Sequence, residues 1–130
     1  MTKLFIIDDD PINNYISEHS LRLNNPEIDL QIFVNPVEAV AFLNTLPFSP
    51  DVLLLLDLNM PQMSGWQVME RLVNLYDTYI LSSSISQSDK EKSRAYQNVK
   101  GFISKPLNRA ISERILSKQN LFILEQEVKL

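Results

Sequence analysis

The chain has 130 residues, with 16 acidic and 12 basic side chains and a formal net charge of −4. This length suits one domain built on a single core, and a hydrophobic content of 45% is adequate for that core. Because the sequence contains no cysteine, disulfides, thiolate metal sites and cysteine nucleophiles are excluded. The negative charge disfavours binding to nucleic acid, because the phosphate backbone would repel it.

Apolar runs in the sequence are short. The longest covers residues 52–56, and the first, residues 4–7, is ended at once by three aspartates. A transmembrane helix needs about 20 apolar residues. We therefore expect no signal peptide, no membrane partner and a cytoplasmic location.

The first half of the chain alternates apolar runs with longer amphipathic stretches. Runs typical of buried strands cover residues 4–7, 30–34 and 52–56, and the last of these is expected to be the central strand. Asp10 and Asn35, each followed by proline, are predicted helix N-caps. The first helix is expected to run to about residue 23, and the second is expected to end before Pro47.

The second half continues the alternation. Residues 62–65 are expected to form a turn, residues 66–75 a helix and residues 79–81 a strand. The sequence from Ser88 to Glu91 matches a capping box and predicts the start of a fourth helix. Residues 101–103 are expected to form a short fifth strand, and Asn108 to cap the last helix.

Five strands alternating with five helices predict a parallel sheet with helices on both faces, since parallel neighbours need crossover connections. In such a sheet, ligands bind beyond the carboxyl ends of the strands. The residues that follow each strand are therefore the candidate functional residues.

Charged and hydroxyl side chains follow four of the predicted strands. They are Asp8 and Asp9, Asp57, Ser82 and Lys105. The acidic side chains outnumber the single lysine at one sheet edge, and clustered carboxylates cannot all stay ionised without compensation. Carboxylate oxygens suit Mg²⁺, so the sequence predicts a magnesium site.

These residues also match the requirements of phosphoryl transfer. Asp57 would be the nucleophile that forms an acyl phosphate. The three outer oxygens of the phosphoryl group need neutralising partners, and the cation, the ammonium of Lys105 and the hydroxyl of Ser82 would supply one each.

Four segments of the sequence together resemble the receiver domain of two-component response regulators, over residues 3 to about 118. These segments are FIIDDDP at 5–11, LLLDLNMPQMSG at 54–65, ILSSS at 80–84 and GFISKP at 101–106. The order and spacing of four separate motifs make the resemblance specific.

The resemblance implies a flavodoxin-like fold with strand order 2-1-3-4-5. It also implies a stand-alone phospho-acceptor that catalyses its own phosphorylation and dephosphorylation rather than acting as an enzyme, with a histidine kinase or phosphotransfer protein as partner. Asp57 matches the phosphorylated residue. Asp9, Asp57 and the backbone carbonyl of Asn59 match the magnesium ligands, with Asp8 acting mainly through a metal-bound water.

The resemblance further implies a switch. Ser82 matches the switch hydroxyl, where threonine is commoner, Lys105 the phosphate-binding lysine and Phe102 the aromatic switch position. The Lys105–Pro106 peptide would be cis. Phosphorylation would draw Ser82 inward, admit the ring of Phe102 and change the face made by the last two helices and the strand between them. We expect that face to bind an unknown downstream protein.

Two alternatives remain at this point. One is an aspartyl-nucleophile phosphohydrolase or phosphotransferase, for example of the haloacid dehalogenase superfamily. That family carries Asp-x-Asp at the nucleophile, whereas this chain has Asp57-Leu58-Asn59. The other alternative is a binding module of the same fold that is not phosphorylated. The presence of the acidic residues, the acceptor and the lysine together argues against this alternative.

The end of the chain is longer than a minimal receiver needs. Residues 1–120 are assigned to the receiver domain, and residues 121–130 to an extension of the last helix or a docking tail. The run Leu-Phe-Ile-Leu at 121–124 covers every face of a helix, so self-association as a homodimer is one expectation for it.

Overall fold

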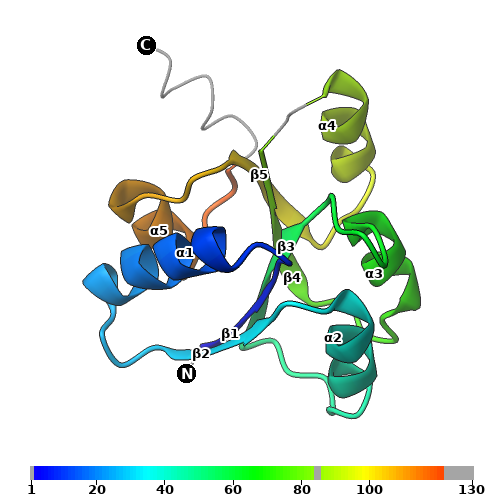
Figure 1. Ribbon diagram of the computed structural model, residues 1–130, viewed down its shortest axis with the longest axis horizontal. Coiled ribbons are helices and arrows are strands. Elements are labelled where there is room, and N and C mark those ends of the chain that lie inside the picture. The colour runs from blue at the N-terminus through cyan, green and yellow to red at the C-terminus, as the bar shows by residue number, and fades with distance from the viewer. Residues whose placement is uncertain (1, 84–85, 122–130) are drawn as a thin grey trace.

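The computed structural model describes residues 2–83 and 86–121, and Figure 1 shows one sheet between two layers of helices. The sheet has five parallel strands in the order β2-β1-β3-β4-β5, which confirms the expected flavodoxin-like topology. The strands are Lys3–Ile7 (β1), Asp29–Phe33 (β2), Val52–Asp57 (β3), Asp77–Ser82 (β4) and Val99–Ser104 (β5). Every residue of β3 is buried, as expected of the central strand.

Two helices cover one face of the sheet and three cover the other. They are Pro11–Asn24 (α1), Pro36–Leu43 (α2), Gly65–Arg71 (α3), Gln87–Arg94 (α4) and Arg109–Leu116 (α5). In Figure 1, α1 and α5 lie together on one side of the sheet, and α2, α3 and α4 lie on the other. A hydrophobic cluster fills each space between helices and sheet, so alternate residues of the buried strands enter different clusters.

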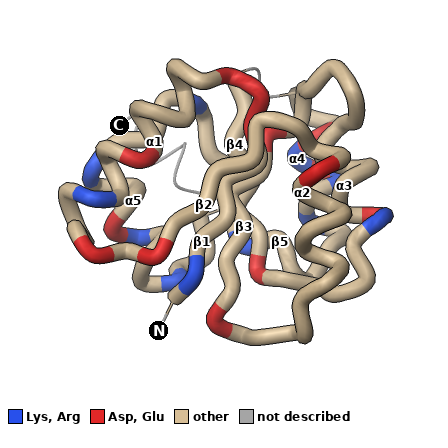
Figure 2. Tube along the Cα trace, turned by 60° about the horizontal axis from the view of Figure 1, so that its bottom comes forward, with Lys and Arg blue, Asp and Glu red and all other residues tan. Residues whose placement is uncertain are grey.

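The charged residues lie mainly at the periphery of this arrangement. Figure 2 shows Lys, Arg, Asp and Glu along the helices and at the strand ends, while the middle of the sheet carries none. Acidic positions also gather where the chain leaves the sheet toward α1. The uncharged middle of the sheet is consistent with burial on both faces.

Three of the predicted helix starts are confirmed. The side chains of Asp10, Asn35 and Asn108 each accept hydrogen bonds from backbone N–H groups of the first turn. The predicted cap of the fourth helix was wrong by two residues. Ser86, not Ser88, caps α4 and accepts from the N–H of Asp89.

The third helix is shorter than predicted. It ends at Arg71 instead of running to residue 75, and the side chain of Val73 is 71% exposed. The side chain of Asn44, between α2 and β3, donates to the carbonyl of Arg71 and accepts from the N–H of Val73. These two bonds satisfy backbone groups at the helix end, so a residue distant in sequence decides where α3 stops.

One backbone feature bears on the sheet edge where ligands are expected. The Lys105–Pro106 peptide is cis, as the resemblance implied.

Within the described residues, no helix is both long and apolar enough to cross a bilayer, and the cytoplasmic location stays a prediction. Ser84 and residues 122–130 lie outside the described residues, so the expected role of the tail, the homodimer and the domain boundary after residue 120 stay predictions.

Candidate functional site

The strand registers bring the predicted site residues to one edge of the sheet. The pairing of β1 with β3 sets Asp8 level with Asp57. The pairing of β3 with β4 sets Ser82 one residue beyond that level, and the pairing of β4 with β5 sets Lys105 one residue beyond Ser82. The side chains that follow four strands therefore converge, as the parallel topology requires.

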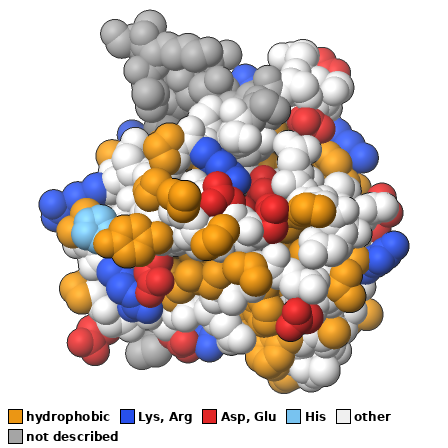
Figure 3. Space-filling view, viewed as in Figure 1, with side chains coloured by type: hydrophobic (Ala, Val, Ile, Leu, Met, Phe, Trp, Pro, Cys, Tyr) orange, Lys and Arg blue, Asp and Glu red, His pale blue; other side chains and the backbone are white. Residues whose placement is uncertain are grey.

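Three carboxylates form a cluster at this edge. One carboxylate oxygen from each of Asp8, Asp9 and Asp57 lies within 4.8 Å of the other two. Asp8 is 1% exposed and Asp57 is 4% exposed, whereas Asp9 is half-buried. In Figure 3 acidic and basic side chains adjoin near the middle of this face, surrounded by hydrophobic and neutral groups.

Lys105 supplies the cation that faces these acids. Its Nζ lies 2.9 Å from Oδ2 of Asp8 and 3.5 Å from Oδ2 of Asp57, and its side chain is 12% exposed. Burial by itself would lower the pKa of Lys105. The hydrogen bond to Asp8 and the charges of both carboxylates outweigh that effect and raise the pKa above 10.5. Lys105 is therefore fully charged at neutral pH.

The pKa of Asp57 moves in the opposite direction from that of a well-paired acid. Burial is the largest cause and the negative charge of Asp8 the second, and together they raise the pKa from 3.8 to about 6. Lys105 and the N–H of Asn59, 3.3 Å from Oδ1, oppose this rise without cancelling it. The fold thus disfavours the ionised form of Asp57. A bound cation would stabilise that ionised form.

Two asparagines hold Asp8 in place, and the sequence analysis missed both. The side-chain amide of Asn13 donates to Oδ2 of Asp8 at 2.8 Å, and that of Asn14 donates to the Asp8 carbonyl at 2.8 Å. The N–H of Asp10 donates to Oδ1 at 2.9 Å. Asparagines in the first turn of a helix look like ordinary surface residues, and only their burial beside a buried carboxylate reveals the contact.

A close backbone approach positions the loop that follows Asp57. The N–H of Gly65 donates to the carbonyl of Leu58 at 2.9 Å. A Cβ atom at Gly65 would lie 2.6 Å from the carbonyl oxygen of Asp57 and 3.0 Å from the Cα of Leu58. Glycine is required here by lack of space and not by a special turn, because its φ is not positive.

The cluster fits a hard divalent cation. Three carboxylates offer oxygen atoms at a mutual distance that one ion can span, and oxygen is the donor that Mg²⁺ prefers. One ammonium group faces three acids, so negative charge is left over. Repulsion by the charge of Asp8 adds to burial in raising the pKa of Asp57.

The two predicted switch residues lie in the interior. Ser82 is 0% exposed at the end of β4, and its carbonyl accepts from the N–H of Lys105 at 2.9 Å. Phe102 is 2% exposed and packs in the cluster beneath α2, α3 and α4. Their roles in switching stay predictions.

Comparisons with known proteins agree with this arrangement. The family model described as response regulator receiver domain matches residues 4–116. A search of curated proteins found no match. Among solved structures, a two-component response regulator from Cytophaga hutchinsonii is 25% identical with a TM-score of 0.78, covering 91% of this chain and 96% of its own.

Two further structures share the fold. A CheY-like response regulator receiver domain protein from Methanospirillum hungatei is 22% identical with a TM-score of 0.74, over 100% of this chain and 99% of that one. A phosphorylated cyanobacterial phytochrome response regulator is 24% identical with a TM-score of 0.75, over 93% and 98%. The motifs, the sheet-edge geometry and the matching family model agree, and the chain belongs to the response regulator receiver domain family.

Proposed function

We propose that this chain is a phospho-acceptor switch in which Asp57 receives a phosphoryl group from a histidine kinase or a phosphotransfer protein. The observation that carries the proposal is the contact of one buried lysine with two buried carboxylates at the sheet edge, 2.9 Å from Asp8 and 3.5 Å from Asp57. A third carboxylate, Asp9, completes the cluster. The same edge would hold the acceptor, the metal ligands and the phosphate-binding cation.

Magnesium would be held by Asp9, Asp57 and the backbone carbonyl of Asn59, with Asp8 acting through a metal-bound water. When bound, the ion neutralises charge on the phosphoryl oxygens during transfer. Asn13 and Lys105 already occupy Oδ2 of Asp8, and the N–H of Asp10 occupies Oδ1. These bonds favour the indirect role of Asp8, because its oxygens are engaged before any ion arrives.

The transfer step uses the groups around Asp57. A carboxylate oxygen of Asp57 forms a bond to phosphorus while the bond from phosphorus to the donor histidine breaks, and the imidazole keeps that electron pair. Lys105 is close enough to bind a phosphoryl oxygen without moving its backbone. The hydroxyl of Ser82 would bind another oxygen after it moves toward the site.

The switch would run from Ser82 to the face made by α4, β5 and α5. Phe102 of β5 sits in the same hydrophobic cluster as Trp66 of α3, whose ring stacks on Tyr96 at 5.6 Å between centroids. The indole N–H of Trp66 donates to Asp89 of α4 at 3.3 Å. A change in the position of Phe102 therefore has a packed route to α4, and we propose that this face binds the downstream protein.

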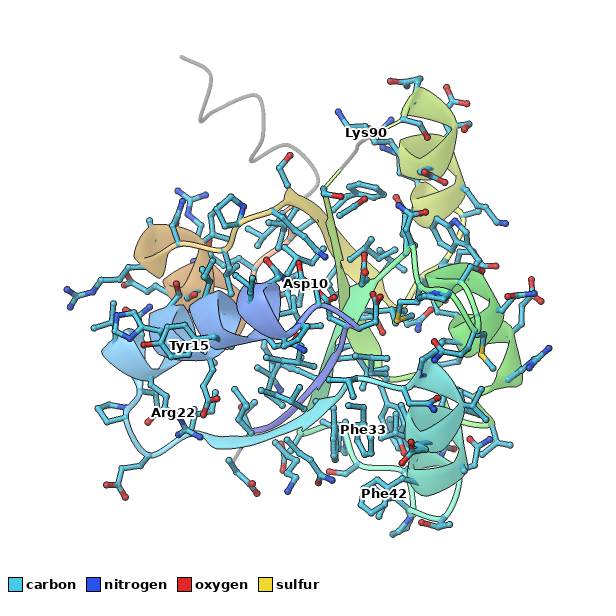
Figure 4. The ribbon with its side chains drawn as sticks, viewed as in Figure 1. Asp10, Tyr15, Arg22, Phe33, Phe42 and Lys90 are labelled. Atoms are coloured by element: carbon cyan, nitrogen blue, oxygen red, sulfur yellow. The ribbon has the colours of Figure 1, made fainter. Side chains whose placement is uncertain are left out.

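The outer side of α1 supports docking of the phosphodonor. Four of the five buried residues of this helix are polar, while two apolar residues of its first turns are exposed: Ile12 is 73% and Tyr15 70% exposed. Tyr15 lies on the outside of α1 and stacks on His19 at 6.3 Å (Figure 4). Because α1 starts directly after the acidic cluster, a helix or loop bound to this apolar surface would lie beside Asp57.

Intact mass after incubation with Mg²⁺ and acetyl phosphate tests the proposal. The wild-type protein is expected to gain one phosphoryl group, and Asp57→Asn to gain none. Equal labelling of Asp57→Asn would refute the acceptor assignment. Turnover of a small phosphate ester at enzymatic rates would favour the phosphohydrolase alternative, and no labelling of the folded wild type with Mg²⁺ would favour the binding module.

The docking surface has its own test. Tyr15→Ala is expected to leave labelling by acetyl phosphate unchanged and to slow transfer from a phosphohistidine donor protein by about 10-fold, as for an interface residue whose truncation costs more than about 1 kcal/mol. Val73→Ala, equally exposed on another part of the surface, is the matched control and should change neither rate. Equal effects of both variants would contradict docking on α1.

A further inference from the structure

The two edges of the sheet differ in how they are covered. At one edge, Leu121 forms a bridge with Gly101 of β5 and donates its N–H to the carbonyl of Lys100 at 2.8 Å. At the other edge, β2 pairs with β1 through all five of its residues. In the part of the chain that the structure describes, nothing pairs with the outer side of β2. An open edge of this kind is a template for a further strand.

The sequence of β2 has none of the features that protect an open edge. Edge strands are commonly blunted by lysine, by proline or by a bulge. This strand reads Asp-Leu-Gln-Ile-Phe, and its register with β1 runs without a shift. Its one charged residue, Asp29, stands at its start and pairs with Lys3 of β1 at 2.9 Å. The middle and the end of β2 are therefore open to pairing.

Backbone geometry shows which groups this edge offers. The carbonyl of Phe33 accepts from the N–H of Asp8 at 3.1 Å, so Phe33 directs its backbone groups inward, toward β1. Successive residues of a strand alternate in this direction. Gln31 therefore also faces β1, while the N–H and C=O groups of Leu30 and Ile32 point outward.

Apolar side chains surround the open edge. Leu30 and Ile32 are partly buried, against the cluster beneath α1 and α5. On the other side of the sheet, the ring of Phe33 contacts that of Phe42 of α2 at 5.5 Å between centroids (Figure 4). Figure 3 shows hydrophobic side chains between α1 and α2, where β2 runs. The edge thus lies within an apolar surface.

We propose that β2 pairs with β2 of a second copy of this chain, antiparallel about a two-fold axis at Gln31. The pairing places Leu30 opposite Ile32 of the second copy, and these two residues exchange both N–H to C=O hydrogen bonds. A two-fold interface requires such self-complementarity. Gln31 then faces its own copy, and a side-chain amide can both donate to and accept from an identical amide.

Charge favours a second copy as the occupant. Each chain has a formal charge of −4, so two copies attract only where they meet without unbalanced charge. The charged side chains near the start of β2 are already paired, Lys3 with Asp29 and Arg22 with Glu18. The one charged residue of α2, Glu38, lies in its first turn, where the helix N-terminus offsets its charge. The surface therefore suits an uncharged, self-complementary partner.

The area of the interface also agrees with a second copy. A ladder of five residues is small beside the about 800 Å² that each partner of a stable interface buries. A two-fold axis perpendicular to the sheet sets α2 beside α2 of the second copy. Phe42 and Val37 of α2 are 37% and 50% exposed, so these side chains can add apolar area on both copies.

The interface is separate from the groups of the proposed function. Strands β2 and β5 lie at opposite edges of the sheet, so pairing through β2 leaves the face made by α4, β5 and α5 free. Asp57 belongs to β3, and β1 lies between β3 and β2. Pairing through β2 therefore goes beyond the proposed function and does not rest on it.

A single cysteine on the axis tests the pairing. The chain contains no cysteine, and a non-hydrogen-bonded antiparallel pair brings its Cα atoms to about 4.5 Å, within the range of a disulfide. Gln31→Cys is expected to give disulfide-linked dimers on mild oxidation. Lys100→Cys, at a similarly half-buried position on the opposite edge strand, is the matched control and should link much more slowly. Equal rates, or faster linking of the control, would overturn the proposal.

Charge at the axis gives a second test that needs no cysteine. Gln31→Lys and Gln31→Glu each set like charges opposite each other, and each should raise the dimer dissociation constant about 5-fold in sedimentation equilibrium. An equal mixture of the two variants should associate at least as tightly as the wild type, because opposite charges then meet. A wild type that stays monomeric up to about 100 µM, or a mixture no tighter than its components, would refute the pairing. Since neither measurement involves phosphorylation, failure here leaves the acceptor role of Asp57 unaffected.

Discussion

Removing the charge of Asp57 should stabilise the magnesium-free protein, although it destroys the acceptor. Burial and the charge of Asp8 raise the pKa of Asp57 from 3.8 to about 6. The folded state therefore keeps a proton between these two values that the unfolded state has lost. Stability falls as pH rises through this interval and stays low above about pH 7, where both states are ionised.

The size of the effect follows from the pKa. A difference between 3.8 and about 6 corresponds to about 3 kcal/mol of unfolding free energy at pH 7.5. The neutral amide of the Asp57→Asn variant has nearly the shape of a protonated carboxyl group and avoids this penalty. We expect the variant to be more stable than the wild type by about 2–3 kcal/mol at pH 7.5 in EDTA, and by little at pH 4.

Urea unfolding at both pH values, followed by far-ultraviolet circular dichroism, measures the difference. Asp29→Asn is the control, because Asp29 is a surface acid whose side chain is 53% exposed and pairs with Lys3; its effect should stay below about 1 kcal/mol. Saturating Mg²⁺ should stabilise the wild type more than Asp57→Asn. If Asp57→Asn gained no stability at pH 7.5, or gained as much at pH 4, the electrostatic account of the site would be refuted.

Three further substitutions test other parts of the structure by the same unfolding assay. Lys105→Met leaves the buried Asp8 and its neighbours without their cation and should cost about 3–5 kcal/mol in EDTA, partly restored by Mg²⁺; wild-type stability would contradict the ion-pair geometry. Gly65→Ala should cost about 1–3 kcal/mol despite the better helix propensity of alanine, because the new methyl group meets the Asp57 carbonyl at 2.6 Å, and acetyl phosphate labelling should slow with it. Lys118→Gly should raise the free energy of unfolding by about 0.5–1 kcal/mol, since glycine adopts φ 58° without strain. A lower free energy of unfolding would show that the side chain of Lys118 stabilises the fold by more than its positive φ destabilises it.

Helix and strand types could be predicted from the sequence because local signals and tertiary demands coincide in this chain. Asp10 followed by Pro11 is a strong local start signal for a helix, and an apolar run such as residues 52–56 suits a strand buried on both faces. Element ends were less predictable. The end of α3 depends on Asn44, which has no sequence signal connecting it to Arg71.

The acidic cluster with its lysine is the part of the site that sequence by itself determined. Parallel topology requires residues after neighbouring strands to meet, so Asp8, Asp57 and Lys105 converge once the strands are assigned. Tertiary structure decided the rest. Burial sets the pKa of Asp57, packing places Asn13 against Asp8, and crowding demands glycine at position 65, since each depends on atoms that only the folded chain brings into contact.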